Sequence, residues 1–139
     1  MYRPPNIDKY ANFALIKLLS SLVDPHLLDS TIVLGDFNLP FINWSNSCVR
    51  NDGIHDSIFD CMTSLGMSQL VTQPTRISNT GQSSTLDLIF TNDPLSINIV
   101  NYMPPFSTSD HLMIHFEIYY NTGPNTAPDD VNSDEIYLP

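Results

Sequence analysis

The most constraining stretch of the chain is an apolar run that ends abruptly in polar residues, Thr31-Ile-Val-Leu-Gly-Asp-Phe-Asn-Leu-Pro40. Its apolar part predicts a buried strand. Side chains alternate between the two faces of a strand, so Asp36 and Asn38 project together from the strand end, while Phe37 projects to the other face. The same residues suit a simple turn, because Gly, Asp, Asn and Pro all favour turns. This stretch alone leaves both interpretations open.

Apolar periodicity predicts the other elements of the chain. A helix capped by Asn6 or Asp8 is expected to end before Pro25, and a second helix is expected from about His55 to Leu65. The residues expected on the buried face of the first helix are Phe13, Ile16, Leu19 and Val23. Short strands are expected at 69–71, 84–91, 97–102 and 111–119. This order of helices and strands predicts a layered α/β domain.

The chain length and the distribution of acidic residues predict one domain followed by a tail. A chain of 139 residues suits a single compact domain. The last twelve residues hold four acids and two prolines but little that could pack: Pro128, Asp129, Asp130, Asp134, Glu135 and Pro139. We therefore expect a domain over 1–120 and an acidic, flexible tail or linker over 121–139.

Charge and cysteine content limit the class of protein. Five basic residues against fifteen acidic ones give a formal charge of −10, the opposite of the basic surface that marks most nucleic-acid binders. Cys48 and Cys61 have no Cys-x-x-Cys spacing, and the N-terminus lacks the apolar core of a signal peptide, so we expect unbridged thiols inside a cell. No window approaches the ~20 apolar residues of a membrane span.

Polar residues recur at the ends of three predicted strands. Asp36 and Asn38 follow the first strand, Asp87 interrupts an apolar one, and Asp110 and His111 immediately precede the last. Carboxylates that converge in a low-dielectric site repel one another unless a cation or a proton lies between them. The pattern therefore favours a metal site.

Each of these residues also has a purely structural interpretation. Asp87 suits a solvent-facing partner of Thr85, and Asp110 suits a turn residue before the strand. The three remaining histidines are expected on the surface: His26, His55 and His115.

Four motifs in this order resemble one known family. They are Gly35-Asp36-Phe37-Asn38, Gln69-Leu-Val-Thr-Gln-Pro-Thr-Arg76, Leu86-Asp87-Leu-Ile-Phe-Thr91 and Ser109-Asp110-His111. Together they resemble the C-terminal half of the endonuclease/exonuclease/phosphatase superfamily. Tyr2-Arg-Pro-Pro-Asn6 and Pro74-Thr-Arg76 are similar to the endonuclease domains of non-LTR retrotransposons of the LINE and jockey type. The resemblance covers residues 1 to about 120 and implies a partial four-layer α/β sandwich, the second half of that fold.

The resemblance implies a catalytic role for several of these residues. Asp36 would position or deprotonate the attacking water, and Asn38 would bind the phosphate or hold Asp36 in place. His111 would lie against the scissile phosphate, oriented by a hydrogen bond with Asp87. Tyr2 would reach a phosphate oxygen. These roles fit the needs of phosphodiester hydrolysis, which are an aligned water, charge stabilisation and help for the leaving oxygen.

The resemblance also implies a cofactor and substrate contacts. Asp110 and Asp36 would lie at a Mg²⁺ or Mn²⁺ ion. The residues expected on the substrate side are Thr75, Arg76 and Arg3.

The family's first half supplies an Asn and a metal-binding Glu that have no counterpart here, since no Glu occurs before Glu117. We therefore expect a fragment of a DNA-nicking endonuclease that is inactive alone. Its expected partners are DNA, the missing N-terminal half and a downstream reverse transcriptase domain, with no membrane, and its expected location is the nucleus of a cell.

Two alternatives remain open at this stage. One is a superfamily phosphatase or phosphodiesterase that acts on a lipid or a small nucleotide, which the acidic balance permits. The other is a non-catalytic, degenerate module that keeps the strands of the fold without its chemistry.

Overall fold

The structure is a computed structural model that describes residues 1–22, 30–44, 48–49, 54–120 and 132–138. The elements in chain order are α1 (Lys9–Leu22), β1 (Ile32–Asp36), β2 (Ile42–Asn43), β3 (Cys48–Val49), α2 (Ile54–Ser64), β4 (Ser68–Gln69), β5 (Arg76–Ile77), β6 (Ser83–Ser84), β7 (Asp87–Thr91), the 3-10 turn η1 (Pro94–Ser96), β8 (Ile97–Met103), β9 (Met113–Tyr120) and β10 (Asn132–Leu138). The predicted α/β class is confirmed.

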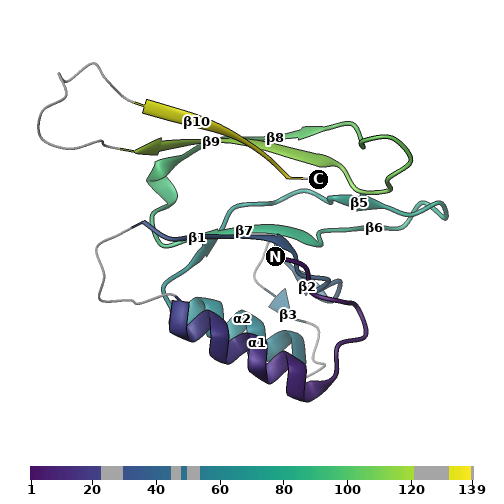
Figure 1. The fold of residues 1–139 in the computed structure, drawn as a ribbon. Coiled ribbons are helices and arrows are strands. Elements are labelled where there is room, and N and C mark those ends of the chain that lie inside the picture. Colours follow the sequence, from purple (N-terminus) through teal and green to yellow (C-terminus); the bar gives the residue numbers. More distant parts are fainter. Residues whose placement is uncertain (23–29, 45–47, 50–53, 121–131, 139) are drawn as a thin grey trace, which may run out of the picture.

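The elements form three layers (Figure 1). The two helices lie against one face of an antiparallel sheet of order β1-β7-β4, and a second antiparallel sheet of order β10-β9-β8 lies against its other face. Two small hairpins, β2-β3 and β5-β6, complete the described architecture. The arrangement supplies a helix layer and both sheet layers of the expected sandwich.

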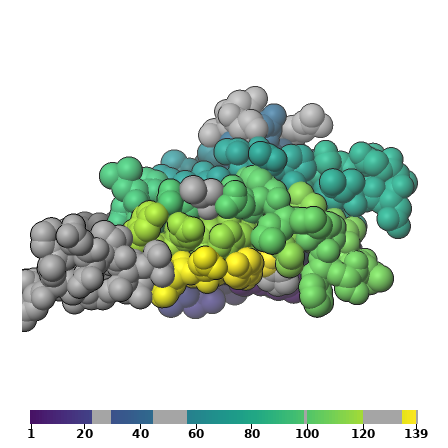
Figure 2. Space-filling model, turned by 90° about the horizontal axis from the view of Figure 1, so that it is seen from above, coloured from purple at the N-terminus to yellow at the C-terminus, as the bar shows by residue number. Residues whose placement is uncertain are grey.

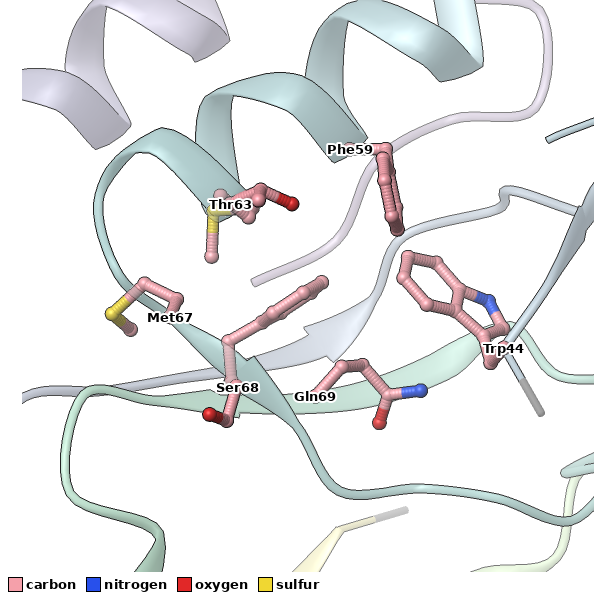
Figure 3. A pocket seen from close by; sticks show the side chains of 8 residues that line it. Trp44, Phe59, Thr63, Met67, Ser68 and Gln69 are labelled. Carbon is pink, nitrogen blue, oxygen red and sulfur yellow. The ribbon is translucent and has the colours of Figure 1, made fainter. Parts of the chain in front are cut away.

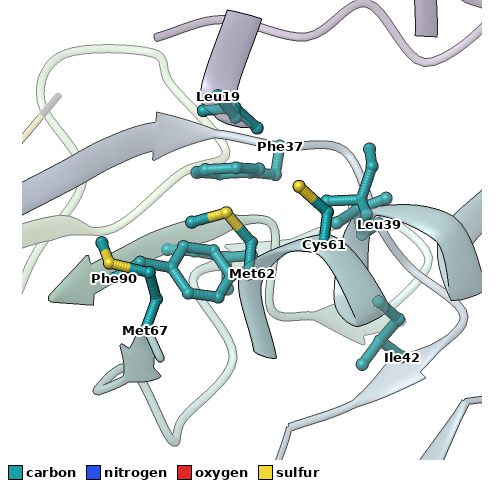
Figure 4. Close-up of a cluster of buried hydrophobic side chains, with 10 residues drawn as sticks. Leu19, Phe37, Leu39, Ile42, Cys61, Met62, Met67 and Phe90 are labelled. Carbon is teal, nitrogen blue, oxygen red and sulfur yellow. The ribbon is translucent and has the colours of Figure 1, made fainter. Parts of the chain in front are cut away.

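The central strand β7 is buried along its whole length because both of its faces are covered. Leu88 and Phe90 face the helices, and the Phe90 ring meets the Phe37 ring edge to face at a centroid distance of 5.1 Å (Figure 4). Ile89 faces the second sheet. This alternation matches the period of two predicted from the sequence.

Two apolar cores result from this layering. The core between the helices and the first sheet contains Leu19, Phe37, Leu39, Ile42, Ile58, Cys61, Met62, Met67, Leu88 and Phe90. The core between the sheets contains Val71, Ile89, Ile114, Phe116 and Leu138. The first sheet is therefore fixed from both sides, which gives its strand ends a rigid base.

The C-terminal strand corrects the prediction of a flexible tail over 121–139. Residues 132–138 form β10, which pairs antiparallel with β9, and Leu138 is buried in the core between the sheets. Figure 2 looks down on this outer sheet and shows β10, in yellow, lying along the green strands. Ile136 and Leu138 alternate with exposed residues and face inward, a strand pattern that the neighbouring acidic residues made hard to recognise in the sequence. Residues 121–131 lie outside the described part of the chain.

Helix α1 begins as predicted, and two of its predicted core residues, Ile16 and Leu19, pack in the core between the helices and the first sheet. The Asp8 carboxylate caps it by accepting hydrogen bonds from the amides of Tyr10, at 2.8 Å, and Ala11, at 2.9 Å. Leu19 is buried as expected, whereas Phe13 is 68% exposed, so its prediction as a core residue was wrong. A polar residue, Asn12, is buried instead.

The predicted strand over 84–91 is divided into β6 and β7. Its ladder is interrupted because the amides of Leu86 and Asp87 both donate to the Thr75 hydroxyl, each at 3.0 Å. The Leu86 carbonyl accepts from the amide of Phe37 at 2.8 Å. These bonds anchor the start of β7 beside the end of β1.

The prediction for the cysteines is also met. Cys61 is a buried free thiol, so it is not bridged to Cys48. Among the described residues, no helix is long and apolar enough to cross a membrane. His26 lies outside the described residues.

The burial of Phe90 generates a stability prediction. Phe90→Ala should lower the free energy of unfolding by about 3–5 kcal/mol, because truncation of a buried Phe removes apolar burial and leaves a cavity. Urea denaturation followed by circular dichroism would measure this change. Phe106→Ala, at a side chain that is 73% exposed, should change it by less than about 0.5 kcal/mol. Equal losses in both variants would contradict the assignment of the core.

Candidate active site

The register of the first sheet brings two predicted site residues together. β1 and β7 pair antiparallel, and Asp36 lies directly opposite Asp87. Residues that are directly opposite in such a pair project from the same face of the sheet. Asp87 is buried and Asp36 is half-buried, so two carboxylates share one sheltered end of the sheet.

Gly35 shows why β1 changes character at this point. A Cβ atom at position 35 would lie 1.8 Å from the carbonyl oxygen of Met1, so only glycine fits there. Met1 runs alongside β1: its amino group donates to the Leu34 carbonyl at 2.7 Å, and its carbonyl accepts from the Asp36 amide at 3.0 Å. This close approach fixes the backbone immediately before the Asp36 carboxylate.

The predicted hydrogen bond between Asp87 and His111 is present. His111 Nδ1 lies 2.8 Å from Asp87 Oδ2. The Ser109 hydroxyl accepts from the His111 amide at 3.1 Å, and the backbone of His111 forms an antiparallel bridge with Arg76. A carboxylate at Nδ1 favours the tautomer that carries its proton there, which leaves Nε2 as the ring nitrogen directed elsewhere.

Asn38 holds both oxygens of the Asp36 carboxylate. Its backbone amide donates to Asp36 Oδ1 at 3.0 Å, and its side-chain Nδ2 donates to Asp36 Oδ2 at 3.0 Å. Asn38 has a φ of 47°, in the left-handed region that Asn tolerates better than most residues. This backbone conformation turns the residue back toward the carboxylate.

The environment of Asp36 raises the pKa of its carboxyl group above the ordinary value. Burial is the largest cause, and the negative charge of Asp87 adds to it. The hydrogen bonds from Asn38 and the positive charge of a protonated His111 act in the opposite direction. The charge of Asp87 therefore disfavours the charged form of Asp36, and a cation between the two side chains would relieve that repulsion.

Three side chains could hold a metal ion. The ligand atoms of Asp36, Asp87 and His111 all lie within 4.8 Å of one another. Carboxylate oxygens suit Mg²⁺ and Mn²⁺, while imidazole suits other divalent metals. The donor set fits a divalent cation that keeps part of its water shell, although one oxygen of Asp87 is shared with His111.

Asp110 lies outside this group, which differs from its expected place at the metal. Its Oδ2 atom pairs with Arg76 Nε at 2.7 Å, and its Oδ1 atom is 3.9 Å from His111 Nε2. The hydrogen bond with Arg76 lowers the pKa of the Asp110 carboxyl group. Asp110 and Arg76 thus form an exposed ion pair at the edge of the site.

The remaining predicted site residues occupy different depths. Tyr2 forms a parallel bridge with Asp36, and its side chain is 67% exposed. Thr75 is fully buried, and its hydroxyl accepts the two amide hydrogen bonds that anchor Asp87. Arg3 is only 3% exposed. Neither Thr75 nor Arg3 therefore offers the surface contact to a substrate that was expected of it, and both belong to the support of the site.

The described residues line two hollows of similar volume. A groove of about 380 Å³ is lined by Pro40, Phe41, Ile42, Asn43, Trp44, Thr72, Pro74, Ser83, Ser84 and Thr85. A second pocket of about 430 Å³ lies between α2 and β4 (Figure 3) and is lined by Trp44, Phe59, Met62, Thr63, Met67, Ser68, Gln69 and Phe90. Two residues that line the groove, Pro40 and Thr85, lie close in sequence to Asn38 and Asp87. The pocket instead adjoins the C-terminal end of β7, at Phe90.

Sequence interpretation missed two residues that support the site. The Ser109 hydroxyl fixes the His111 backbone, and the Ser-x-His spacing is a recognisable turn signal for that bond. Asn12 accepts a hydrogen bond from Arg3 Nε at 3.1 Å. No local signal indicates a supporting role for Asn12, because its partner Arg3 is nine residues away and only the fold buries the two side chains together.

Comparison with known proteins places this geometry in a family. The family model described as "Endonuclease-reverse transcriptase" matches residues 1–115. Among solved structures, the chain is similar to the endonuclease domain of TRAS1, a telomere-specific non-LTR retrotransposon, with a TM-score of 0.62 and 26% identity over 84% of this chain. The match covers 52% of that domain, so the chain spans about half its length. No curated protein matches the sequence.

The ion pair at the edge of the site generates a pH prediction. Arg76→Gln should raise the pKa of Asp110 toward its ordinary value, because the variant removes the hydrogen bond and the charge that lower it. The native pair contributes stability above the unfolded-state pKa of Asp110, and this contribution is lost as the pH falls through the lowered pKa. Carboxyl ¹³C NMR titration would measure the pKa.

Lys17→Gln is the matched control, since it removes an exposed cation from α1 and should leave the Asp110 titration unchanged. An unchanged Asp110 titration in Arg76→Gln would show that the ion pair does not persist in solution.

Proposed function

The chain belongs to the endonuclease-reverse transcriptase family, and from this premise we propose that it forms part of a divalent-metal-dependent endonuclease that nicks DNA. The observation that carries the proposal is the convergence of Asp36, Asp87 and His111 at one end of the first sheet. The likeness to the endonuclease domain of a non-LTR retrotransposon supports DNA as the substrate.

His111 is proposed to act on the scissile phosphate. Asp87 accepts the Nδ1 proton, so the imidazole is held in one tautomer with Nε2 available to the substrate. Nε2 lies 3.9 Å from Asp110, which in turn is held by Arg76, so the far side of the ring faces the exposed edge of the site. A ring held in this way stabilises charge on a phosphoryl oxygen without reorganising.

Asp36 is proposed to position and deprotonate the attacking water. Its carboxylate is half-buried and held through both oxygens by Asn38. Tyr2, whose backbone pairs with Asp36, is proposed to reach a phosphate oxygen from the neighbouring strand.

Asp36 and Asp87 are the residues that would hold a Mg²⁺ or Mn²⁺ ion, with His111 beside them. When bound, such an ion supplies charge stabilisation at the phosphoryl oxygens and lowers the pKa of a coordinated water. Without it, the two opposed carboxylates would repel a phosphodiester as well as each other. A DNA strand would meet the edge of the site at Arg76, a partly exposed cation that is paired with Asp110.

The proposal extends to partners and location. We propose that the chain acts next to a reverse transcriptase domain, as the description of its family suggests, and in the nucleus, where chromosomal DNA is its substrate. Because the chain spans about half of the TRAS1 endonuclease domain, we also propose that it needs the remaining part of such a domain to cleave.

A plasmid assay would test this function. The enzyme would be the chain joined to the part of the TRAS1 endonuclease domain that it does not match, and the readout would be Mg²⁺-dependent relaxation of supercoiled plasmid. His111→Ala and Asp36→Ala should each lower the nicking rate at least about 10²-fold, as expected for loss of a general acid or base. His115→Ala is the control, because that histidine stacks on Tyr137 in the outer sheet and should be dispensable.

The outcomes of this assay separate the alternatives. Full activity in the His111 variant would contradict the assignment of the site. Nicking by the 139-residue chain alone, at the rate of the joined protein, would contradict the need for the remaining part. Hydrolysis of p-nitrophenyl phosphate without plasmid nicking would favour a phosphatase instead.

A further inference from the structure

Arg3 is a buried cation beneath the loop that carries the proposed catalytic groups. Its guanidinium donates from Nη1 to the carbonyls of Asn38, at 3.0 Å, and Phe37, at 3.3 Å. Its Nε atom donates to the Oδ1 atom of Asn12, at 3.1 Å, on helix α1. The side chain therefore ties the loop after β1 to the helix layer.

The main chain of Arg3 also forms hydrogen bonds with this loop. Its amide donates to the carbonyl of Asp36 at 2.8 Å, and its carbonyl accepts from Asn38 Nδ2 at 2.8 Å. The Nδ2 group of Asn38 is thereby shared between the Arg3 backbone and the Asp36 carboxylate. One residue thus contacts both the start and the end of the Asp36–Asn38 loop.

The loop needs such support because of its backbone conformation. Asn38 has a φ of 47°, a conformation that persists in a non-glycine residue when the surroundings determine it. In that conformation its amide and its side chain both donate to the Asp36 carboxylate. The carbonyls of Phe37 and Asn38 are the groups whose direction fixes this turn, and Arg3 is their donor.

We propose that Arg3 and Asn12 are positioning residues that hold the Asp36–Asn38 loop in its metal- and water-binding geometry. The planar fork of a guanidinium allows Nε and Nη1 to reach helix and loop at once, which the single ammonium of lysine cannot reproduce. The catalytic consequence rests on the proposed function. The effect on the conformation of the Asp36–Asn38 loop does not rest on the proposed function, because it concerns contacts within the chain.

The test compares Arg3→Lys, which keeps the charge, and Asn12→Ala with the control Lys17→Gln. The first readout is amide hydrogen exchange by NMR on the 139-residue chain. Exchange at Asn38, whose amide bonds to Asp36, should accelerate at least tenfold in both test variants. Exchange at Leu70, whose amide donates to the Ile89 carbonyl in the first sheet, should stay within twofold and reports the global fold.

The second readout is Mn²⁺ affinity, measured by paramagnetic relaxation, which should weaken about tenfold in both variants and not in the control. In the joined nuclease, Arg3→Lys should lower kcat and leave KM within twofold, whereas a DNA contact would raise KM. Unchanged exchange at Asn38, or equal acceleration at Asn38 and Leu70, would overturn the proposal. If the joined nuclease does not bind Mn²⁺, the proposed function fails, while the exchange result still decides the positioning role. If Arg3→Lys does not fold, Asn12→Ala decides it by the same criteria.

Discussion

The antiparallel register between β1 and β7 is the constraint on which the rest of the site depends. It sets Asp36 directly opposite Asp87, so that both carboxylates leave the sheet from one face. A slip of one residue would turn either carboxylate to the opposite face and break the alternation that fills the two cores. Because Leu88 and Phe90 face the helices while Ile89 faces the second sheet, the same packing that stabilises the domain also fixes the register of the carboxylates.

Two carboxylates that face each other lower the stability of the fold unless hydrogen bonds or positive charges offset their repulsion. In this chain, neighbouring side chains provide these partners. Asn38 donates two hydrogen bonds to Asp36, and His111 lies against Asp87. Arg76 neutralises Asp110 at the exposed edge. The remaining imbalance is visible in the raised pKa of Asp36, and it is the kind of unrelieved charge that a divalent cation satisfies. The overall charge of −10 does not exclude a phosphate substrate, because a divalent cation at the two carboxylates would offset the negative charge of the site.

Periodicity allowed much of this arrangement to be predicted. Alternation in the run ending at Asp36 placed that carboxylate at a strand end, whereas Asp87 was predicted within a strand and the structure shows that β7 begins there. The cap at Asp8 was one of the two predicted, Asn6 or Asp8. The burial of Phe13 was wrongly predicted because α1 is apolar around much of its surface and Asn12 occupies the inward face. The strand β10 was missed because its acidic residues resemble a solvated tail until β9 provides an edge for it.

The support of the site could not be predicted, since it consists of contacts between distant segments. Arg3 reads as a surface cation, and only the fold shows it buried and bonded to Phe37 and Asn38. Asp110 was predicted either as a turn residue or at the metal, and only the bridge between Arg76 and His111 brings its counter-ion to it. Family resemblance supplied roles for these residues, but their burial and partners assign Arg3 and Thr75 to support.

The central claim is that the paired ends of β1 and β7 form a cation site, and anomalous X-ray scattering from Mn²⁺-soaked crystals tests it most directly. At saturating Mn²⁺, we predict an anomalous peak bonded to the Asp36 carboxylate and lying among Asp36, Asp87 and His111. A peak bonded to Asp110 with Asp36 unliganded, or no peak within this group at saturation, would contradict the account.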